Sequence, residues 1–114
     1  MLTYHEAPED LFDPNVPSYV PSDYAKEGFI HTTVPLARIP EIANRHYLED
    51  PRPYLLLTID LDRLTSPWRY DRAGEDFPHI YGPLNREAVV DIRIMPRAPD
   101  GTFLEIEPFP LAEG

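Results

Sequence analysis

The chain has 114 residues, with twenty acidic residues against ten lysines and arginines and a formal net charge of −10. This length suits a single domain over residues 1–114, and the acidic charge opposes binding to the phosphate backbone of a polynucleotide. The absence of cysteine excludes disulfides and cysteine-ligated metals. Since we find no apolar run of membrane-spanning length and no signal pattern, we expect a soluble, cytoplasmic, acidic protein.

The fifteen prolines disfavour long helices, because proline lacks a backbone N–H and clashes with the preceding turn. The core should therefore come mainly from short strands. The pattern predicts a first strand over residues 2–5, a helical turn over 8–12 and an irregular loop over 13–23. A second strand is predicted at 29–32, and Thr33 is expected to cap the helix that follows.

The second half of the chain carries the strongest periodic signals. Apolar side chains recur every three or four residues over 36–47, which predicts a helix, and the apolar run over 54–60 predicts a central buried strand. Further strands are predicted at 68–70, 88–95 and 102–107. The strand at 88–95 alternates, with its apolar side predicted to be buried: Val90, Ile92 and Ile94. These elements indicate an α+β fold, a small twisted or split, mostly antiparallel sheet with one principal helix.

Two stretches concentrate histidine, glycine and other polar residues, namely residues 27–33 and 77–85. Rigid loops that present polar side chains commonly build binding sites, and a glycine such as Gly82 allows the backbone to approach a ligand closely. We expect the two stretches to meet at one cleft together with the first strand. The candidate ligand-binding residues are Gly28, Thr33, His79, Tyr81, Gly82 and Asn85.

Histidine is the side chain best suited to proton transfer near neutral pH. His5 and His31 lie at the ends of predicted strands, and we take them as candidate catalytic residues. The alternative for each is a structural, hydrogen-bonded histidine, and the residues leave both open. His46 lies on the apolar repeat of the predicted helix, so packing explains it better. The histidines lack the close spacing typical of zinc sites, and no metal site is predicted.

The motifs EGFIH at residues 27–31 and FPHIYGPLN at 77–85 resemble a small bacterial family called "domain of unknown function 952". The resemblance also includes Tyr4-His5 and residues 42–45 and 55–60, and it covers most of the chain up to about Arg93. The family has no established activity. It is remotely similar to the ADP-ribosyltransferase-like fold, a pair of small, mostly antiparallel sheets around a cleft that holds nicotinamide dinucleotide (NAD) or a related nucleotide.

That remote likeness implies a first-strand role for His5 and a second-strand role for His31. It also implies a late glutamate, and Glu105 and Glu107 are late enough in the chain but lie beyond the matched region. The leading hypothesis is a cleft lined by His and Tyr that binds a small molecule. The ligand options are NAD, another nucleotide or another small phosphorylated ligand. Transferase-like chemistry in this cleft is a further option. The alternative is a non-enzymatic protein-interaction module whose His and Tyr residues are structural.

Overall fold

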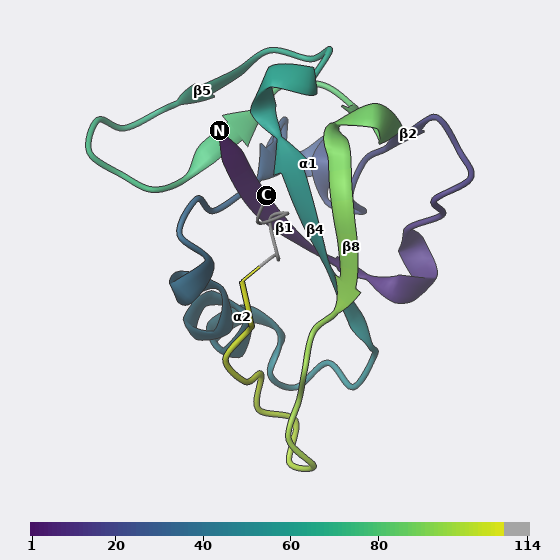
Figure 1. The fold of residues 1–114 in the computed structure, drawn as a ribbon, viewed down its shortest axis with the longest axis vertical. Helices are drawn as coiled ribbons and strands as arrows, with labels where there is room; N and C mark the ends of the chain where they lie inside the picture. The colour runs from purple at the N-terminus through teal and green to yellow at the C-terminus, as the bar shows by residue number, and fades with distance from the viewer. Residues whose placement is uncertain (109–114) are drawn as a thin grey trace, which may run out of the picture.

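The computed structural model describes residues 1–108, which form three small antiparallel sheets and one principal helix (Figure 1). The main sheet has the order β1-β4-β8, with β1 at Leu2–Pro8, β4 at Tyr54–Asp60 and β8 at Val89–Ile94. A second sheet has the order β3-β6-β5, with β3 at Ile30–His31, β6 at Pro78–Ile80 and β5 at Trp68–Tyr70. The third pairs β2, Ser18–Tyr19, with β7, Leu84–Asn85.

The helical elements are short. The principal helix is α2 at Ile39–Tyr47, and α1 is a single turn at Tyr24–Glu27. Four 3₁₀ turns occupy Glu9–Leu11, Leu36–Arg38, Leu61–Arg63 and Arg86–Ala88. Among the described residues, no helix has the length and apolar composition needed to span a bilayer.

The strand β4 is the centre of the main sheet, as the apolar run predicts. Its residues from Tyr54 to Ile59 are all buried, and it pairs antiparallel with β1 on one side and β8 on the other. The register places His5 opposite Leu57 and Glu6 opposite Leu56. Because successive side chains of a strand point to opposite faces, His5 and Glu6 leave β1 on opposite sides of the sheet.

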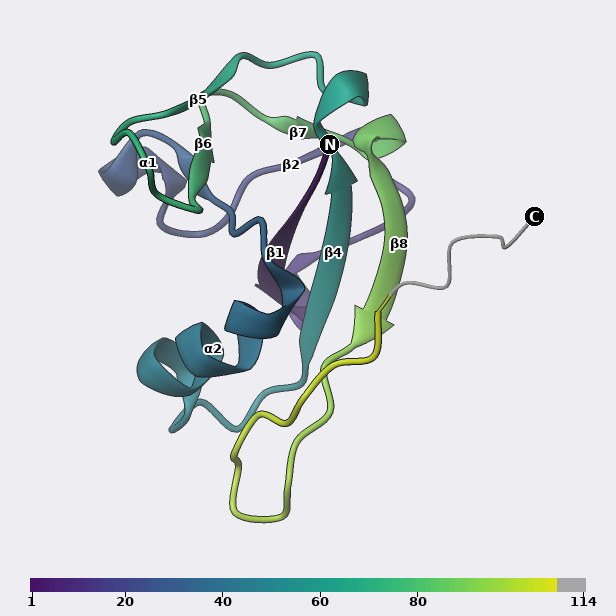
Figure 2. The same ribbon diagram turned by 60° about the vertical axis from the view of Figure 1, so that its left-hand side comes forward.

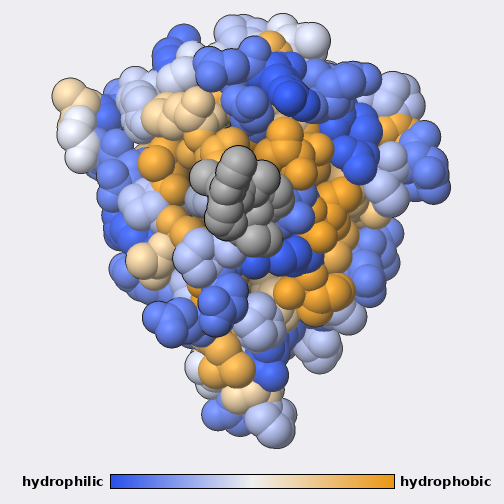
Figure 3. Space-filling view, viewed as in Figure 1, coloured by the Kyte–Doolittle hydropathy of each residue, from blue (hydrophilic) through white to orange (hydrophobic). Residues whose placement is uncertain are grey.

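Each face of the main sheet has its own core. On one face Leu57 and Ile59 pack with Ile30 and Ile80 of the second sheet. The other face carries Leu56, which belongs to a cluster with α2 and the C-terminal segment. Figure 2 shows the result, with the small sheets above and α2 below, both next to β1. In the direction of Figure 1, apolar side chains gather in the middle of the visible surface (Figure 3).

The helix predicted over 36–47 is confirmed, as a 3₁₀ turn that runs into α2. Its buried residues Ile39 and Ala43 lie one turn apart and face the core. Pro40 stands at the start of the helix, where its missing N–H removes no intrahelical bond. The capping role expected for Thr33 is wrong, because Pro35 occupies the cap position and the backbone of Thr33 pairs with Tyr4 instead.

Two other expectations about strands are wrong. Residues 102–107 form no strand, because Phe103 donates its N–H to the Asn44 side chain of α2, at 2.7 Å, instead of to a neighbouring strand. In β8 the apolar alternation fails at both ends. After a register shift at Thr58, Val89 and not Val90 is the buried valine, and at the other end Ile94 is 54% exposed while Met95 is buried. The core that packs on this face of the sheet includes Ile92, and β8 ends at Ile94. Met95 instead joins the cluster around α2.

Candidate functional site

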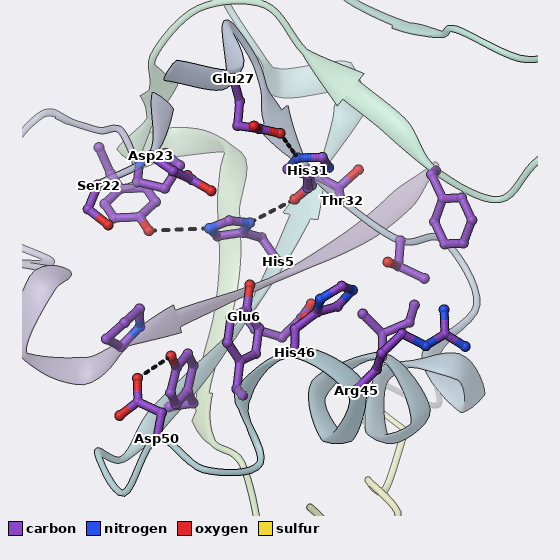
Figure 4. A pocket seen from close by; sticks show the side chains of 18 of the residues that line it. His5, Glu6, Ser22, Asp23, Glu27, His31, Thr32, Arg45, His46 and Asp50 are labelled. Carbon is purple, nitrogen blue, oxygen red and sulfur yellow. Dashed lines mark hydrogen bonds and ion pairs between the residues drawn. The ribbon is translucent and has the colours of Figure 1, made fainter. Parts of the chain in front are cut away.

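A cavity of about 780 Å³ follows the outer edge of β1, with α2 on one side and the second sheet on the other (Figure 4). At the start of this edge Tyr4 exchanges two backbone hydrogen bonds with Thr33, both 2.9 Å long. Among residues 1–108, no further strand pairs with the outer side of β1 beyond that bridge. His5 therefore reaches the cavity from one face of β1, and Glu6 reaches it from the other.

All four histidines of the chain line this cavity, although they come from separate elements. His5 is on β1, His31 on β3, His46 on α2 and His79 on β6. The volume lies within the range usual for small-molecule sites. The structure thus brings together four of the predicted site residues: His5, His31, Thr33 and His79.

His5 is buried, and both of its ring nitrogens have protein partners. Its Nδ1 lies 2.8 Å from the backbone carbonyl oxygen of His31, which can only accept a hydrogen bond. Nδ1 is therefore assigned the proton, and Nε2 accepts from the Tyr19 hydroxyl at 3.2 Å. Burial lowers the pKa of His5, which favours this neutral form. The ring ties β1 to β3 and to β2.

Glu6 is the one cavity carboxyl that is both buried and without a side-chain partner among the described residues. It is 9% exposed, and its side chain points into the space between His5 and α2 (Figure 4). Burial raises the pKa of Glu6 to about 7, and its own backbone N–H offsets only part of this increase. The carboxyl can therefore gain or lose a proton near neutral pH.

His31 is held by the helix turn that precedes it. Its Nε2 lies 2.9 Å from a carboxylate oxygen of Glu27, at the end of α1. Gly28 then ends α1 with φ of 83°, a left-handed conformation that glycine adopts without strain, and this turns the chain into β3. The hydrogen bond from His31 lowers the pKa of Glu27. The pair is exposed at the mouth of the cavity.

His79 belongs to a group that we call the Asp71 cluster, comprising Arg69, Asp71, His79 and Tyr81. Asp71 accepts hydrogen bonds from Arg69 Nε, from the Tyr81 hydroxyl and from His79 Nδ1, the last at 2.6 Å. These donors, Arg69 first, hold the pKa of Asp71 well below its usual range. Phe29 stacks on the His79 ring, with centroids 4.0 Å apart. The cluster fixes His79 so that Nδ1 is occupied and Nε2 is left for other partners.

The remaining predicted site residues, Gly28, Tyr81, Gly82 and Asn85, do not line the cavity. Tyr81 still contributes through Asp71. A side chain at Gly82 would collide with Ser66, and Asn85 accepts from the Thr65 N–H at 3.0 Å. The last two therefore hold the turn after β4. Direct ligand contact by these four residues stays a prediction.

The side of the cavity next to α2 contains residues that sequence analysis missed. His46, which we expected to pack in the core, is exposed and lines the cavity, so that expectation is wrong. Arg45 is beside it, and its nearest anion is Glu41 at 3.6 Å. Glu6 had no sequence signal, because it follows the strand predicted over residues 2–5. Glu105, where a late glutamate was sought, is exposed and lies outside the lining.

Polar side chains that follow α2 in the chain close the cavity at this end, and they are joined by hydrogen bonds and an ion pair. Tyr54 donates its hydroxyl hydrogen bond to Asp50 at 2.7 Å, and its ring stacks on Tyr47 with centroids 4.7 Å apart. Arg52 pairs with the same carboxylate at 2.8 Å and holds the pKa of Asp50 well below its usual range. Asp50 and Arg52 therefore neutralise each other, which leaves Arg45 as the cation available at this wall.

These features define a small α+β protein in which a histidine-lined cavity follows the free edge of an antiparallel sheet. The sequence model of the family described as "Protein of unknown function (DUF952)" matches residues 13–92, and the chain belongs to this family. The fold is similar to the crystal structure of protein CC0527 from Caulobacter crescentus, with a TM-score of 0.74 and 22% identity over 91% of this chain and 94% of that chain.

A double mutant of the same Caulobacter protein matches almost equally well, with a TM-score of 0.73 and 21% identity over the same shares of the two chains. At this identity the likeness shows the fold alone. No curated protein matches the chain in sequence.

Proposed function

We propose that the protein binds a small molecule in this cavity, and that the ligand is a nucleotide or another small phosphorylated compound. The observation that carries the proposal is the convergence of all four histidines on one cavity of about 780 Å³. Protein contacts at both ring nitrogens account for His5, but His31 and His46 are exposed. Side chains that can both donate and accept hydrogen bonds are gathered there from four elements, which is typical of a ligand site.

The phosphate of such a ligand would bind at the end of α2. Arg45 and His46 lie in the last turn of this helix, and both line the cavity. The side chain of Arg45 is 63% exposed, and its contact with Glu41 is a surface ion pair, which contributes little to stability. Its guanidinium is therefore free to form charge-assisted hydrogen bonds with phosphate oxygens. The acid Glu27 is on the opposite side and is already bonded to His31.

The relation to the ADP-ribosyltransferase-like fold is part of the same proposal. His5 stands on the first strand and borders the cavity, as that relation implies. Its two protein contacts suit a positioning role, in which it fixes the backbone of His31. Transferase-like chemistry would need a carboxyl group in the cavity, and Glu6 supports this further step.

A protein-interaction role is the second candidate, because apolar side chains gather on the surface shown in Figure 3. The two candidates differ in what they expect of the cavity. An interaction module would leave it without a small ligand, whereas the ligand-site proposal requires a saturable complex.

The test is a titration of the purified protein with AMP, NAD, ADP-ribose and ribose 5-phosphate, followed by calorimetry and thermal unfolding. A ligand at one hundred times its dissociation constant should add about 2.7 kcal/mol to the free energy of unfolding. Arg45→Gln should weaken binding of every phosphorylated probe. The matched control is Arg72→Gln, which removes an exposed arginine, 3.6 Å from Glu75, outside the cavity. If none of these probes binds, the proposal is wrong.

A further inference from the structure

The main sheet has a second edge, on the side away from the cavity. β8 is the last strand in the order β1-β4-β8, and among residues 1–108 no strand pairs with its outer side, which we call the β8 edge. Figure 2 shows β8 at one side of the sheet, with β4 and then β1 beside it. Proteins usually block such an edge, because its unpaired backbone groups can bond to another strand.

The two edges of the main sheet are blocked to different degrees. On β1 the backbone of Tyr4 already bonds to Thr33, and Pro8 at the other end lacks an N–H. β8 contains neither proline nor lysine, the residues that commonly block an edge. Of the two, the β8 edge is therefore the one open to pairing with another strand.

The backbone bonds of β8 show which of its residues face this edge. Met95 donates its N–H to the carbonyl oxygen of Tyr54, on β4, at 2.8 Å. Because the backbone groups of a strand alternate between its two sides, the N–H and C=O groups of Ile94 and Ile92 point outward. A register shift in the pairing with β4 ends this regular pattern just before Asp91. The β8 edge thus presents two outward-facing residues, both of them isoleucines.

The side chains along the β8 edge complement those of the same strand running in reverse. In the sequence Val90-Asp91-Ile92-Arg93-Ile94, one acid and one base are equally far from Ile92. In an antiparallel pair with a twofold axis at Ile92, Asp91 lies directly opposite Arg93 of the second copy, and the reverse holds as well. These are positions between hydrogen-bonded pairs, where side chains are closest, and opposite charges there stabilise a sheet. Apolar residues meet at the remaining positions.

Other registers of the same two strands are disfavoured. A shift by one residue moves the side chains of one strand to the wrong face. A shift by two residues places Asp91 opposite Asp91, or Arg93 opposite Arg93, and like charges directly opposite are destabilising. The charges on this strand therefore select one register of a pair formed by two copies.

Pairing within one chain does not fully satisfy these two charges. Arg93 Nε lies 2.9 Å from Asp91 Oδ2, but neither atom forms a hydrogen bond of ordinary geometry. Arg93 Nη1 donates to the Glu107 carbonyl oxygen at 2.6 Å, which holds the guanidinium on this face of the sheet. Both side chains are still partly exposed, so a second copy can reach them.

We propose that the protein forms a twofold symmetric homodimer in which β8 pairs antiparallel with β8 of a second copy, so that two main sheets join into one. The central contacts are the backbone bonds of the Ile92 pair and two ion pairs between Asp91 and Arg93. The net charge of −10 opposes association at long range, but the charges at the β8 edge balance. The cavity follows the opposite edge of the sheet, so this inference is independent of the proposed function.

The first measurement is sedimentation of the parent protein from micromolar to millimolar concentration, over which we expect a dimer to form. Hydrogen exchange followed by NMR gives the local readout. The N–H groups of Ile92 and Ile94 face the open edge, so their exchange should slow as the protein concentration rises. A parent protein that stays monomeric over this range overturns the inference, and so does exchange at these two amides that is independent of concentration.

Charge reversal tests the register. Asp91→Arg and Arg93→Asp each place like charges opposite each other twice in a homodimer, so each variant alone should have a dissociation constant at least about tenfold higher than the parent protein. An equimolar mixture of the two variants should associate more tightly than either alone, because one strand then carries two arginines and the other carries two aspartates. This recovery would also show that both variants are folded.

Two further variants complete the design. Arg72→Asp is the matched control, because it reverses an arginine that is 80% exposed in the loop after β5, and it should associate like the parent protein. Ile94→Lys changes a residue that is 54% exposed, so it should weaken association and keep the fold. The inference is overturned if the charge reversals or Ile94→Lys associate as tightly as the parent protein, or if the mixture gains nothing over its components. A dimer that ignores these changes uses another surface.

Discussion

Glu6 lines the cavity and Asp71 bonds to His79 of its lining, and the surroundings of these two carboxylic acids have opposite effects on their pKa values. Asp71 accepts hydrogen bonds from Arg69, Tyr81 and His79, and these donors hold its pKa well below the usual range. Glu6 has no such donors, and burial raises its pKa to about 7. Asp71 thus acts as a permanent anion that orients His79, whereas Glu6 can change its charge near neutral pH.

The difference teaches how one chain obtains two kinds of carboxyl from the same chemical group. Asp71 is exposed and lies beside β5, where side chains of β5 and β6 reach it from two sides. Glu6 lies within β1, whose outer edge is next to the cavity. Burial of Glu6 and the hydrogen-bond donors around Asp71, more than the identity of the acid, set which form is stable.

The largest expected effect is a gain in stability from Glu6→Gln at pH 8. The folded pKa of Glu6, about 7, lies above its ordinary value of 4.5, so the folded state retains a proton that the unfolded chain loses first. Stability therefore falls as pH rises from about 4.5 to about 7, by about 3 kcal/mol in total. The Glu6→Gln variant does not show this loss of stability, because the glutamine side chain does not ionise. Urea unfolding at pH 4.5 and pH 8 should show the variants diverging only at the higher pH.

Glu27→Gln is the matched control, because the pKa of Glu27 is lowered by its hydrogen bond with His31. This variant should gain nothing at pH 8. If Glu6→Gln were less stable than the parent protein at pH 8, the carboxylate of Glu6 would have a stabilising partner in the folded protein, and the contrast with Asp71 would disappear.

The second effect concerns the histidine that precedes Glu6 on β1. His5→Ala should cost about 1–3 kcal/mol, because it leaves the His31 carbonyl and the buried Tyr19 hydroxyl without partners. His31→Ala is the comparison, since the His31 side chain is 56% exposed, and its loss should stay within about 0.5 kcal/mol. Urea unfolding at pH 7 measures both. A larger loss for His31→Ala would assign the structural role to His31 and not to His5.

The parts of this arrangement that the sequence predicts are those set by local periodicity. The apolar run over 54–60 specified the central strand, and the spacing over 36–47 specified α2, because both patterns record which side chains are buried. The sequence analysis did not identify Glu6, because its role depends on the unpaired outer edge of β1. Local sequence patterns do not reveal which edge of a strand stays unpaired. The strand expected over 102–107 failed for a related reason, since a side chain of α2, Asn44, supplies the hydrogen bond to Phe103.

The candidate site was predictable to a similar degree. Clustering of His, Gly and Tyr identified the stretches that carry His31 and His79, and both line the cavity. Periodicity misassigned His46, because the helix face that packs on the sheet ends close to the face that borders the cavity. The partner of His79 could not be predicted from the sequence either. Asp71 is eight residues away across a turn, and it meets His79 only when β5 pairs with β6.

The smallest expected effect is that of Asp71→Asn, which tests the other half of the comparison. Asparagine offers one acceptor oxygen where the carboxylate offers two, so it cannot satisfy all three donors of the Asp71 cluster. The cluster is exposed, and water can replace the lost bonds, so the melting temperature at pH 7 should fall only slightly. Because the folded pKa of Asp71 is lowered, its contribution is present above the ordinary pKa of 3.8 and is lost as pH falls through the folded value. The two proteins should therefore melt closer together at pH 3 than at pH 7, which is the reverse of the trend for Glu6.

The local readout for Asp71→Asn is the tautomer of His79, followed by nitrogen NMR of the imidazole rings. In the parent protein Asp71 holds the proton on Nδ1, and Phe29 stacks on the ring at 4.0 Å. Without the carboxylate, His79 should populate both neutral tautomers, while the signals of His46, which has no bond to Asp71, stay unchanged. If His79 keeps its Nδ1 proton in Asp71→Asn, stacking on Phe29 and the backbone of β6 orient the ring. Asp71 would then bond to a His79 ring that other contacts already orient, and would not itself determine the orientation of the ring.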